Sequence, residues 1–172
     1  MDTFYKYSLI FLVIFSCTIL AQFQPGARQI ALAHSDVALS NDVFALFGNP
    51  AGISQLSSNQ VGIFYSPSPF GVKELANGFL AYNQPTTFGN FGVGFMIYGF
   101  ELYKENRFQF GYSKMFYENF LLGITAFYQS INIKNYGDNG YFNFTVGSQN
   151  NTINLPSRKV HYYSGNFYIN DF

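Results

Sequence analysis

The chain has 172 residues, of which 48% are hydrophobic and 21% aromatic, but only 10% are charged, against roughly 25% in an average soluble domain. So little charge argues against an ordinary water-facing surface. The balance of nine Lys and Arg residues with nine Asp and Glu residues excludes the basic field that attracts nucleic acid. Aromatic residues favour strands, and Gly and Asn favour turns. We therefore expect an all-β protein that does not bind nucleic acid.

Residues 1 to 21 have the pattern of a cleavable signal peptide. Lys6 precedes an apolar run from Leu9 to Phe15, and the small residue Ala21 offers a cleavage site before a polar residue, which is typical of an exported protein. The alternatives are an uncleaved N-terminal anchor and a lipoprotein signal in which Cys17 would be lipidated. After cleavage at Ala21 the mature chain would have no cysteine, and hence neither a disulfide nor a thiol nucleophile.

Residues 22 to 58 are small and polar, and we expect them to form an N-terminal plug segment and not a barrel strand. Ser40 or Asn41 can cap a short helix from about Asn41 to Phe47, and Gly48 can end this helix in a left-handed conformation. Asn49-Pro50-Ala51-Gly52 then predicts a turn, because its proline cannot continue the helix and its glycine permits a positive φ.

From residue 59 to residue 172 the hydrophobic periodicity is two, which predicts consecutive antiparallel hairpins with one apolar and one small or polar face. Polar turns are expected at residues 66–71, 103–106, 117–119 and 135–140. Six strands are clear, and a seventh is expected from about Lys159 to Asn170. The apolar positions are Val61, Ile63, Tyr65, Leu80, Tyr82, Phe91, Val93, Phe95, Ile97, Phe108, Phe110, Tyr112, Leu122, Ile124, Ala126, Tyr128, Phe142, Phe144 and Val146.

Two pairs of apolar residues are out of phase with the strands that precede them. In the third strand, Phe100 and Leu102 are out of step with Phe91 to Ile97, and in the fifth, Ile131 and Ile133 are out of step with Leu122 to Tyr128. Bulges, or strand ends that continue into loops beyond a membrane, would explain both pairs.

The predicted strands, at roughly 9 to 14 residues, are long enough to cross a bilayer when tilted. The alternative is a secreted soluble β-sandwich or lipocalin-like barrel, whose apolar face turns inward and whose outer face is charged. The near absence of charge on the polar face favours the membrane. We therefore expect an antiparallel transmembrane β-barrel in the bacterial outer membrane, in contact with the lipid bilayer.

The sequence offers no constellation typical of an enzyme, a metal site or a cofactor site. His34 and His161 have no acidic or cysteine neighbour at metal-ligand spacing, and no Gly-x-Ser-x-Gly elbow occurs. The pair Gly92-x-Gly94 lacks the following helix that a phosphate cradle requires, and small residues facing a lumen explain it better. We therefore expect no catalytic residues, no metal and no cofactor.

Three segments carry a family resemblance. Gly26-Ala27-Arg28, the segment from Ser40 to Phe47 and Asn49-Pro50-Ala51-Gly52, behind an export signal and ahead of aromatic hairpins, resemble the start of the FadL-like outer-membrane transporters. They resemble more closely the PorV/PorQ-like proteins associated with type IX secretion. The resemblance covers residues 26 to about 147. It implies a barrel of roughly fourteen strands with an N-terminal hatch in its lumen. The plug or gating residues that it implies are Gly26, Arg28, Asn49, Pro50, Ala51 and Gly52.

The resemblance implies transport or binding of a hydrophobic or other small solute. A second hypothesis is a non-transporting component of a protein secretion system, in which the loop from Ser66 to Leu75 would contact another protein. A third is a secreted soluble β-domain. Bacterial single-chain barrels close with even strand numbers, so six or seven strands indicate the N-terminal part of a larger barrel. The competing hypothesis is a complete eight-stranded barrel that ends at Phe172.

Overall fold

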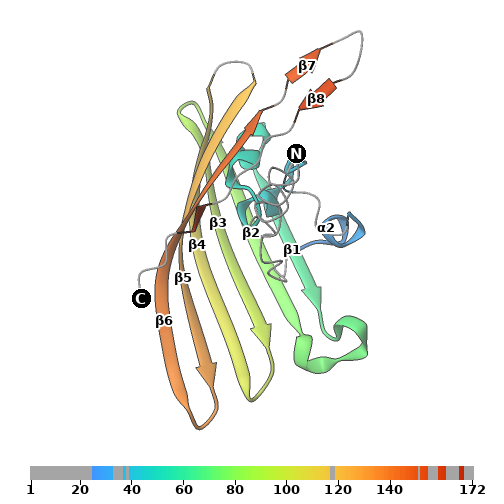
Figure 1. Ribbon diagram of the computed structural model, residues 1–172, viewed down its shortest axis with the longest axis vertical. Helices are drawn as coiled ribbons and strands as arrows, with labels where there is room; N and C mark the ends of the chain where they lie inside the picture. Colours follow the sequence, from blue (N-terminus) through green and yellow to red (C-terminus); the bar gives the residue numbers. More distant parts are fainter. Residues whose placement is uncertain are drawn as a thin grey trace, which may run out of the picture.

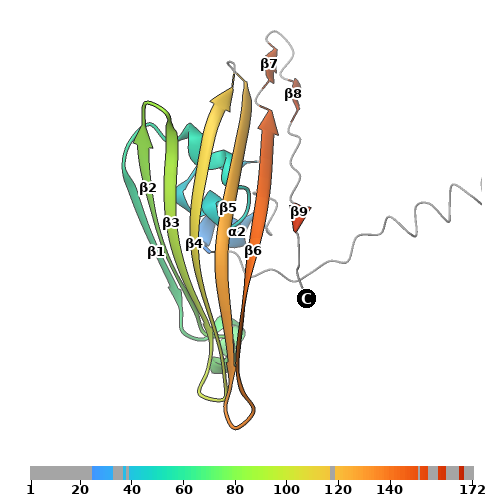
Figure 2. The ribbon, with the colours of Figure 1, turned by 90° about the vertical axis from the view of Figure 1, so that its left-hand side faces the viewer.

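The computed structural model describes residues 25–32, 37, 39–116 and 119–150, and the backbone of three short strands at 152–154, 159–161 and 167–168. The predicted signal peptide lies outside these residues. Six long strands form one antiparallel sheet, with short N-terminal helices against one of its faces (Figures 1 and 2). The strands are β1 (Gln60–Ser66), β2 (Asn77–Thr86), β3 (Gly89–Gly99), β4 (Tyr103–Phe116), β5 (Phe120–Ile133) and β6 (Gly137–Asn150).

The strands follow one another across the sheet in chain order, as the alternating hairpin pattern predicts. A short strand, β9 (Phe167–Tyr168), adds to β6, while β7 (Thr152–Asn154) and β8 (Lys159–His161) pair with each other. The expected seventh strand at residues 159–170 corresponds to the short strands β8 and β9 and otherwise lies outside the described residues. Within the described residues the sheet is open, with β1 at one edge and β9 at the other.

The register separates the sheet into an outer face and an inner face. One outer row runs through Leu80, Phe95, Phe108, Tyr128 and Phe142 on five successive strands. Most of the inner positions carry small or polar residues, and the N-terminal segment packs on part of this face. Four large apolar residues also lie on it and are buried: Phe79, Met96, Leu121 and Phe127. The predicted apolar face is therefore confirmed, whereas the opposite face combines small and polar residues with a few large apolar ones.

Two predicted turns are displaced in the structure. The turn expected at 103–106 is wrong, because β4 already begins at Tyr103 and the chain reverses at residues 100–102, after Gly99 with a φ of 104°. The turn expected at 135–140, between β5 and β6, lies at residues 134–136, so that Gly137 already belongs to β6. Phe100 and Leu102 lie beyond β3, whereas Ile131 and Ile133 continue β5 in unbroken register with β4. The out-of-phase pair Phe100 and Leu102 thus marks the end of a strand, and the pair Ile131 and Ile133 involves no bulge.

The described part of the N-terminal segment contains the short helix α2 (Ala27–Ala31) and the 3₁₀ helices η2 (Val43–Leu46) and η3 (Pro50–Gln55). The expected helix at 41–47 is present in this shorter form. Its N-cap is Asp42, whose carboxylate accepts the Phe44 N–H at 3.0 Å, in place of Ser40 or Asn41. Two further 3₁₀ turns, η4 (Pro69–Gly71) and η5 (Lys73–Leu75), lie in the loop between β1 and β2.

The predicted turn at Asn49–Gly52 is present as the first turn of η3: the Gly52 N–H donates to the Asn49 carbonyl at 3.0 Å, Pro50 begins the helix and Asn49 caps it. Proline is favourable at the first position of a helix, where its missing N–H would have no partner in any case. Neither Gly48 nor Gly52 adopts a positive φ, so neither acts as a left-handed stop. A Cβ on Gly52 would instead lie 2.0 Å from the Ser40 carbonyl oxygen. Close packing within the segment, and not backbone conformation, explains this glycine.

Candidate functional site

The described residues from 25 to 56, which we call the plug, pack on the inner face of the sheet. Leu46 and Ile53 of the plug and Ala81 of β2 are almost completely buried together. Phe47 adds an edge-to-face contact with the ring of Phe79, at a centroid distance of 5.2 Å. The largest apolar core of the described chain therefore lies between the plug and the sheet, and the plug is integral to the fold.

Glycines on the inner face allow the plug backbone to approach the sheet closely. A Cβ on Gly123 would lie 2.4 Å from the carbonyl carbon of Pro50, and one on Gly147 would lie 2.1 Å from Asn49 Oδ1. Four other inner-face glycines would likewise place a Cβ within 3 Å of a plug side chain: Gly62, Gly92, Gly94 and Gly111. These glycines form a docking surface for the plug.

Asn49 makes a buried polar connection between the plug and the sheet. Its side chain is fully buried, and its amide nitrogen donates to the carbonyl oxygens of Val37, at 3.1 Å, and Ser148 of β6, at 3.2 Å. Its amide oxygen accepts the N–H of Ala51 at 3.2 Å and so caps η3. One side chain thus both starts a plug helix and ties it to β6.

Two further hydrogen-bonded positions join the plug to the sheet. The Ser40 hydroxyl donates to Gln149 Oε1 of β6 at 2.8 Å. On the other side of the plug, the amide nitrogen of Asn90 in β3 donates to the carbonyl oxygens of Ile53 and Leu56 at 2.5 and 2.8 Å. The plug is therefore bound at two separate strands of the sheet.

Arg28 belongs to a clasp between α2 and the start of η2. It forms an ion pair with Asp42 at 3.3 Å, and the side chain of the neighbouring Gln29 donates to the same carboxylate at 2.8 Å. The partner of Arg28 is therefore an acid of the plug itself and not an acid of the sheet. Gly26 precedes the clasp with a φ of 108°, a conformation that glycine adopts without strain.

Several buried polar atoms on the inner face make no hydrogen bond within the described structure. They are Asn83 Oδ1 and Nδ2, Gln109 Nε2, Ser113 Oγ and Thr125 Oγ1. A buried polar group without a partner costs about 1–3 kcal/mol relative to its hydrated state. Undocking of the plug would return these groups to water, so their burial opposes the apolar contacts that hold the plug in place.

A second polar group lies on the inner face nearer the turns at residues 100–102 and 134–136. Arg107 donates twice to Gln129 Oε1, at 2.9 and 2.7 Å, and Gln129 donates to Glu105 at 2.8 Å. The guanidinium of Arg107 lies 4.5 Å from the centre of the Phe127 ring, and the Tyr103 hydroxyl donates to Glu105. The plug helices lie toward the opposite end of the sheet (Figure 1).

The sequence pattern assigns Tyr103 and Glu105 to a turn and Arg107 to a strand, and therefore does not predict that these side chains form one group. Of the six predicted site residues, Asn49, Pro50, Ala51 and Gly52 come together on the docking surface, whereas Gly26 and Arg28 lie apart in the clasp. Glu105 and Arg107 continue the polar side of the alternation toward the start of β4, before its apolar residues begin. This pattern is the signal that could have identified them.

Within the described part of the chain, no group of three or more His, Cys, Asp or Glu side chains is placed to hold a metal ion. His34 lies outside the described residues, as does the side chain of His161. No helix in the same part of the chain combines the length and apolar character needed to cross a membrane. Comparisons with protein-family models, with curated proteins and with solved structures found no match.

Proposed function

We propose that this chain contributes to a β-barrel in the bacterial outer membrane, with lipid against its outer face and the plug against its inner face. The barrel would bind or pass a hydrophobic or other small solute. The observation that carries the proposal is the inverted distribution of polarity. Gln109 and Thr125 are buried, while Phe95, Phe108 and Phe110 are exposed. A soluble sandwich turns its apolar face inward, whereas a membrane barrel turns it toward lipid.

The exposed apolar residues form a band of the height that a membrane requires. On the outer face of β4, Phe108, Phe110 and Tyr112 lie between the polar residues Asn106 and Lys114. Eight residues at about 3.4 Å each span about 27 Å along the strand, or about 21 Å along the membrane normal at a tilt near 40°. The apolar belt of membrane barrels is about 25 Å tall, so the two heights agree.

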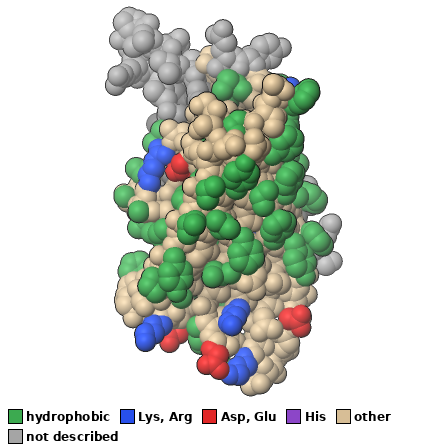
Figure 3. All heavy atoms as spheres, turned by 180° about the vertical axis from the view of Figure 1, so that it is seen from behind, with side chains coloured by type: hydrophobic (Ala, Val, Ile, Leu, Met, Phe, Trp, Pro, Cys, Tyr) green, Lys and Arg blue, Asp and Glu red, His purple; other side chains and the backbone are tan. Residues whose placement is uncertain are grey.

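Most charged groups border this band, and Lys114 lies on its outer face between Tyr112 and Phe116 of β4. In the view of Figure 3, apolar side chains gather over the middle of the molecule and most acidic and basic side chains lie at its lower end, with a further basic and acidic group at the left side. The charged residues at that end include Lys73 and Glu74 of η5 and the ion pair between Lys134 and Glu101. This arrangement is typical of a membrane protein whose charged turns lie in water.

The free edge of β1 adds a requirement to the proposal. Backbone N–H and C=O groups without partners cost several kcal/mol each in the hydrocarbon layer. Further strands that pair with this edge and complete the barrel are therefore part of the proposed arrangement.

The plug connects the barrel with solute passage. It covers part of the polar inner face, and the unpartnered atoms at Gln109, Ser113 and Thr125 favour its release into water. Asn49 and Ser40 hold it in place through hydrogen bonds to β6. Because hydrogen bonds hold the plug in place while buried polar atoms without partners favour its release, the plug is suited to move when a solute arrives.

A second candidate function is attachment to a partner protein of a secretion system. Phe70, between Pro69 and Gly71 in the loop from Ser66 to Leu75, has 95% of its surface exposed. Tyr136 in the turn after β5 is 91% exposed. Exposed aromatic side chains of this kind are enriched at protein interfaces. Loss of a co-purifying partner in a Phe70→Ser variant would favour this role.

Reconstitution of the full-length gene product tests the proposal. We expect it to float with neutral liposomes and to admit a hydrophobic fluorophore such as pyrene. Cysteines in place of Ser40 and Gln149, in a Cys17→Ser background, can be joined by a short thiol-reactive cross-linker because the native side chains touch. Cross-linking should reduce uptake, and each single-cysteine variant treated with the same reagent is the matched control.

Three results would count against parts of the proposal. A chain that remains in the aqueous phase without detergent would contradict the membrane assignment and favour a secreted soluble domain. Insertion without uptake, together with co-purification of secretion proteins, would favour the second candidate. Uptake that is unchanged by the cross-link would contradict movement of the plug.

A further inference from the structure

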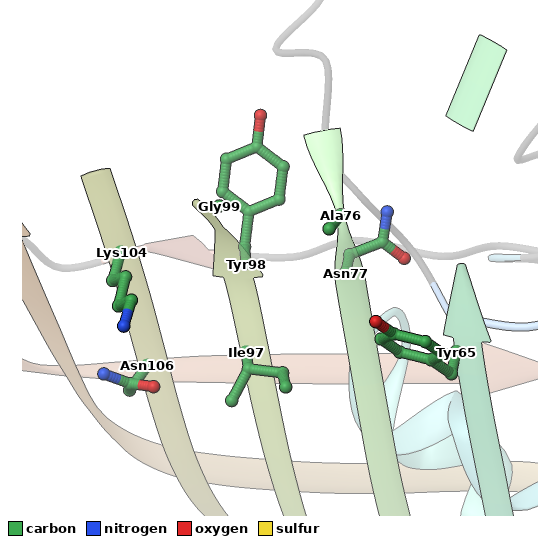
Figure 4. Close-up of a pocket in the computed structure, with 8 residues that line it drawn as sticks. All are labelled: Tyr65, Ala76, Asn77, Ile97, Tyr98, Gly99, Lys104 and Asn106. Carbon is green, nitrogen blue, oxygen red and sulfur yellow. The ribbon is translucent and has the colours of Figure 1, made fainter. Parts of the chain in front are cut away.

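We propose that a pocket at the border of the apolar band binds the phosphate-bearing head group of an anionic lipid. This inference rests on the proposed membrane location. The pocket has a volume of about 290 Å³ and lies where β1 to β4 approach the charged turns (Figure 4). Its central row on the outer face runs from Tyr65 through Gly78 and Ile97 to Asn106 on four successive strands.

Tyr65 and Ile97 form the apolar side of the pocket, and Gly78 lies between them in the sheet. A Cβ on Gly78 would lie 3.1 Å from Ile97 Cγ1 and 3.4 Å from Tyr65 Cδ2, so the two side chains pack over the glycine and a larger side chain here would extend into the pocket. Leu80 and Phe95, both exposed, occupy the next row toward the middle of the band. The pocket therefore opens directly onto the surface where acyl chains would lie.

The other wall of the pocket is polar and cationic. Lys104 and Asn106 alternate on the outer face of β4, and Figure 4 shows the lysine extended along the strand toward the asparagine. Neither side chain forms a hydrogen bond or an ion pair with another described residue. Lys134 and Arg28, in contrast, are paired with acids. The Lys104 ammonium group and the Asn106 amide are free to donate to a ligand.

Nearby acids do not neutralise Lys104. Glu105 lies on the opposite face of β4 and is hydrogen-bonded to Gln129 and Tyr103. Asp138 is in the same outer row but two strands away, with Asn132 between them. Glu101 is paired with Lys134, and Glu74 lies in η5 outside the pocket lining. Lys104 is the only charged residue among those that line the pocket, so the lining itself carries a positive charge at the level where apolar side chains give way to polar ones.

These properties together match an amphiphilic anion. A phosphate oxygen accepts from an ammonium group and an amide, and charge-assisted hydrogen bonds of this kind are strong. The continuity between the pocket and the apolar band favours a phosphate that is attached to acyl chains over a free anion. Lysine also reaches from an apolar surface to the level of the head groups, where its charge remains hydrated.

The test compares lipid binding by the full-length protein in neutral vesicles that contain a small fraction of spin-labelled phosphatidylglycerol or phosphatidylcholine. We expect the wild-type protein to prefer phosphatidylglycerol. Lys104→Gln should weaken this preference about tenfold, through loss of a charge-assisted contact. Gly78→Leu should weaken it comparably, because it fills the pocket and leaves the lysine in place. Lys114→Gln, at the other border of the band on the same strand, is the control and should retain the preference.

Flotation of the same samples separates failure of the inference from failure of the proposed function. A wild-type protein that does not insert overturns both. Equal lipid selectivity in inserted wild-type, Lys104→Gln and Lys114→Gln proteins overturns the lipid site alone. Displacement of the labelled lipid by millimolar inorganic phosphate would also overturn it, since that result would show a site for a free anion.

Discussion

The amide oxygen of Asn49 lies directly over Gly147, so that a Cβ on this glycine would be only 2.1 Å from it. The same Asn49 side chain caps η3 and donates to the neighbouring Ser148 carbonyl. Docking of the plug on β6 therefore requires both the glycine at position 147 and the Asn49 side chain above it.

Gly147→Ala should displace the plug from β6. The added methyl group cannot fit beneath Asn49, and overpacking of this kind typically costs about 1–3 kcal/mol. We expect faster protease cleavage between residues 37 and 58 and a lower thermal midpoint. Gly78→Ala is the matched control, because its Cβ would meet only the side chains of Ile97 and Tyr65, at 3.1 Å or more. Equal protease resistance of the two variants would show that the plug does not dock on Gly147.

Replacement of Asn49 distinguishes its capping role from its role as a donor. Asn49→Ala should cost about 2 kcal/mol, through loss of the helix cap and of two buried hydrogen bonds. Asn49→Asp keeps a good cap but places a carboxylate against the carbonyl oxygens of Val37 and Ser148. We therefore expect Asn49→Asp to be at least as destabilising in a urea titration. An aspartate variant with wild-type stability would restrict Asn49 to the local cap.

Thr125→Val should stabilise the docked plug. The buried Thr125 hydroxyl makes no hydrogen bond in the described structure, and an apolar group of similar shape removes a desolvation cost of about 1 kcal/mol. Thr86→Val provides the opposite control, because the Thr86 hydroxyl is hydrogen-bonded to the Gly89 carbonyl. Protease resistance of the plug should rise in the first variant and should not rise in the second. A loss of resistance in Thr125→Val would contradict the unpartnered state of the hydroxyl.

The clasp should respond unequally to removal of its two charged partners. Arg28 is largely exposed, so Arg28→Ala should cost no more than about 1 kcal/mol. Asp42 accepts from Arg28, Gln29 and the Phe44 N–H, so Asp42→Ala should cost about 1–2 kcal/mol as the cap of η2 is also lost. Thermal midpoints of the two single variants and the double variant measure the difference. A greater loss on removal of Arg28 would contradict the cap.

The sequence predicted the sheet more fully than the plug. Alternation from Phe91 to Ile97 is a local, two-residue pattern, and it identifies both the strand and its apolar face. In β4 the apolar alternation starts only at Phe108, although the strand already begins at Tyr103. The sequence pattern therefore places the preceding turn too late in the chain. The closed transmembrane barrel stays a prediction, since the described sheet has two edges.

The plug docking surface depends on contacts that sequence patterns do not encode. Asn49-Pro50-Ala51-Gly52 indicated an interruption of a helix, but the start of η3 at Pro50 and its contact with Gly123 require the packed sheet. Arg107 and Gln129 likewise meet only because β4 and β5 pair in one particular register. Local propensity predicts the elements, and the long-range register determines which side chains touch.

The orientation of the outer face toward lipid can be measured most directly by depth-dependent fluorescence quenching. A fluorophore would be attached to single cysteines at Phe108, Phe110, Gln109 or Gly111 in the full-length protein, which would then be reconstituted in vesicles with brominated acyl chains. Strong quenching at positions 108 and 110 and weak quenching at 109 and 111 is the expected result, because the two pairs lie on opposite faces of β4. Equal quenching at all four positions, or stronger quenching at 109 and 111, would contradict the assignment of the apolar face to lipid.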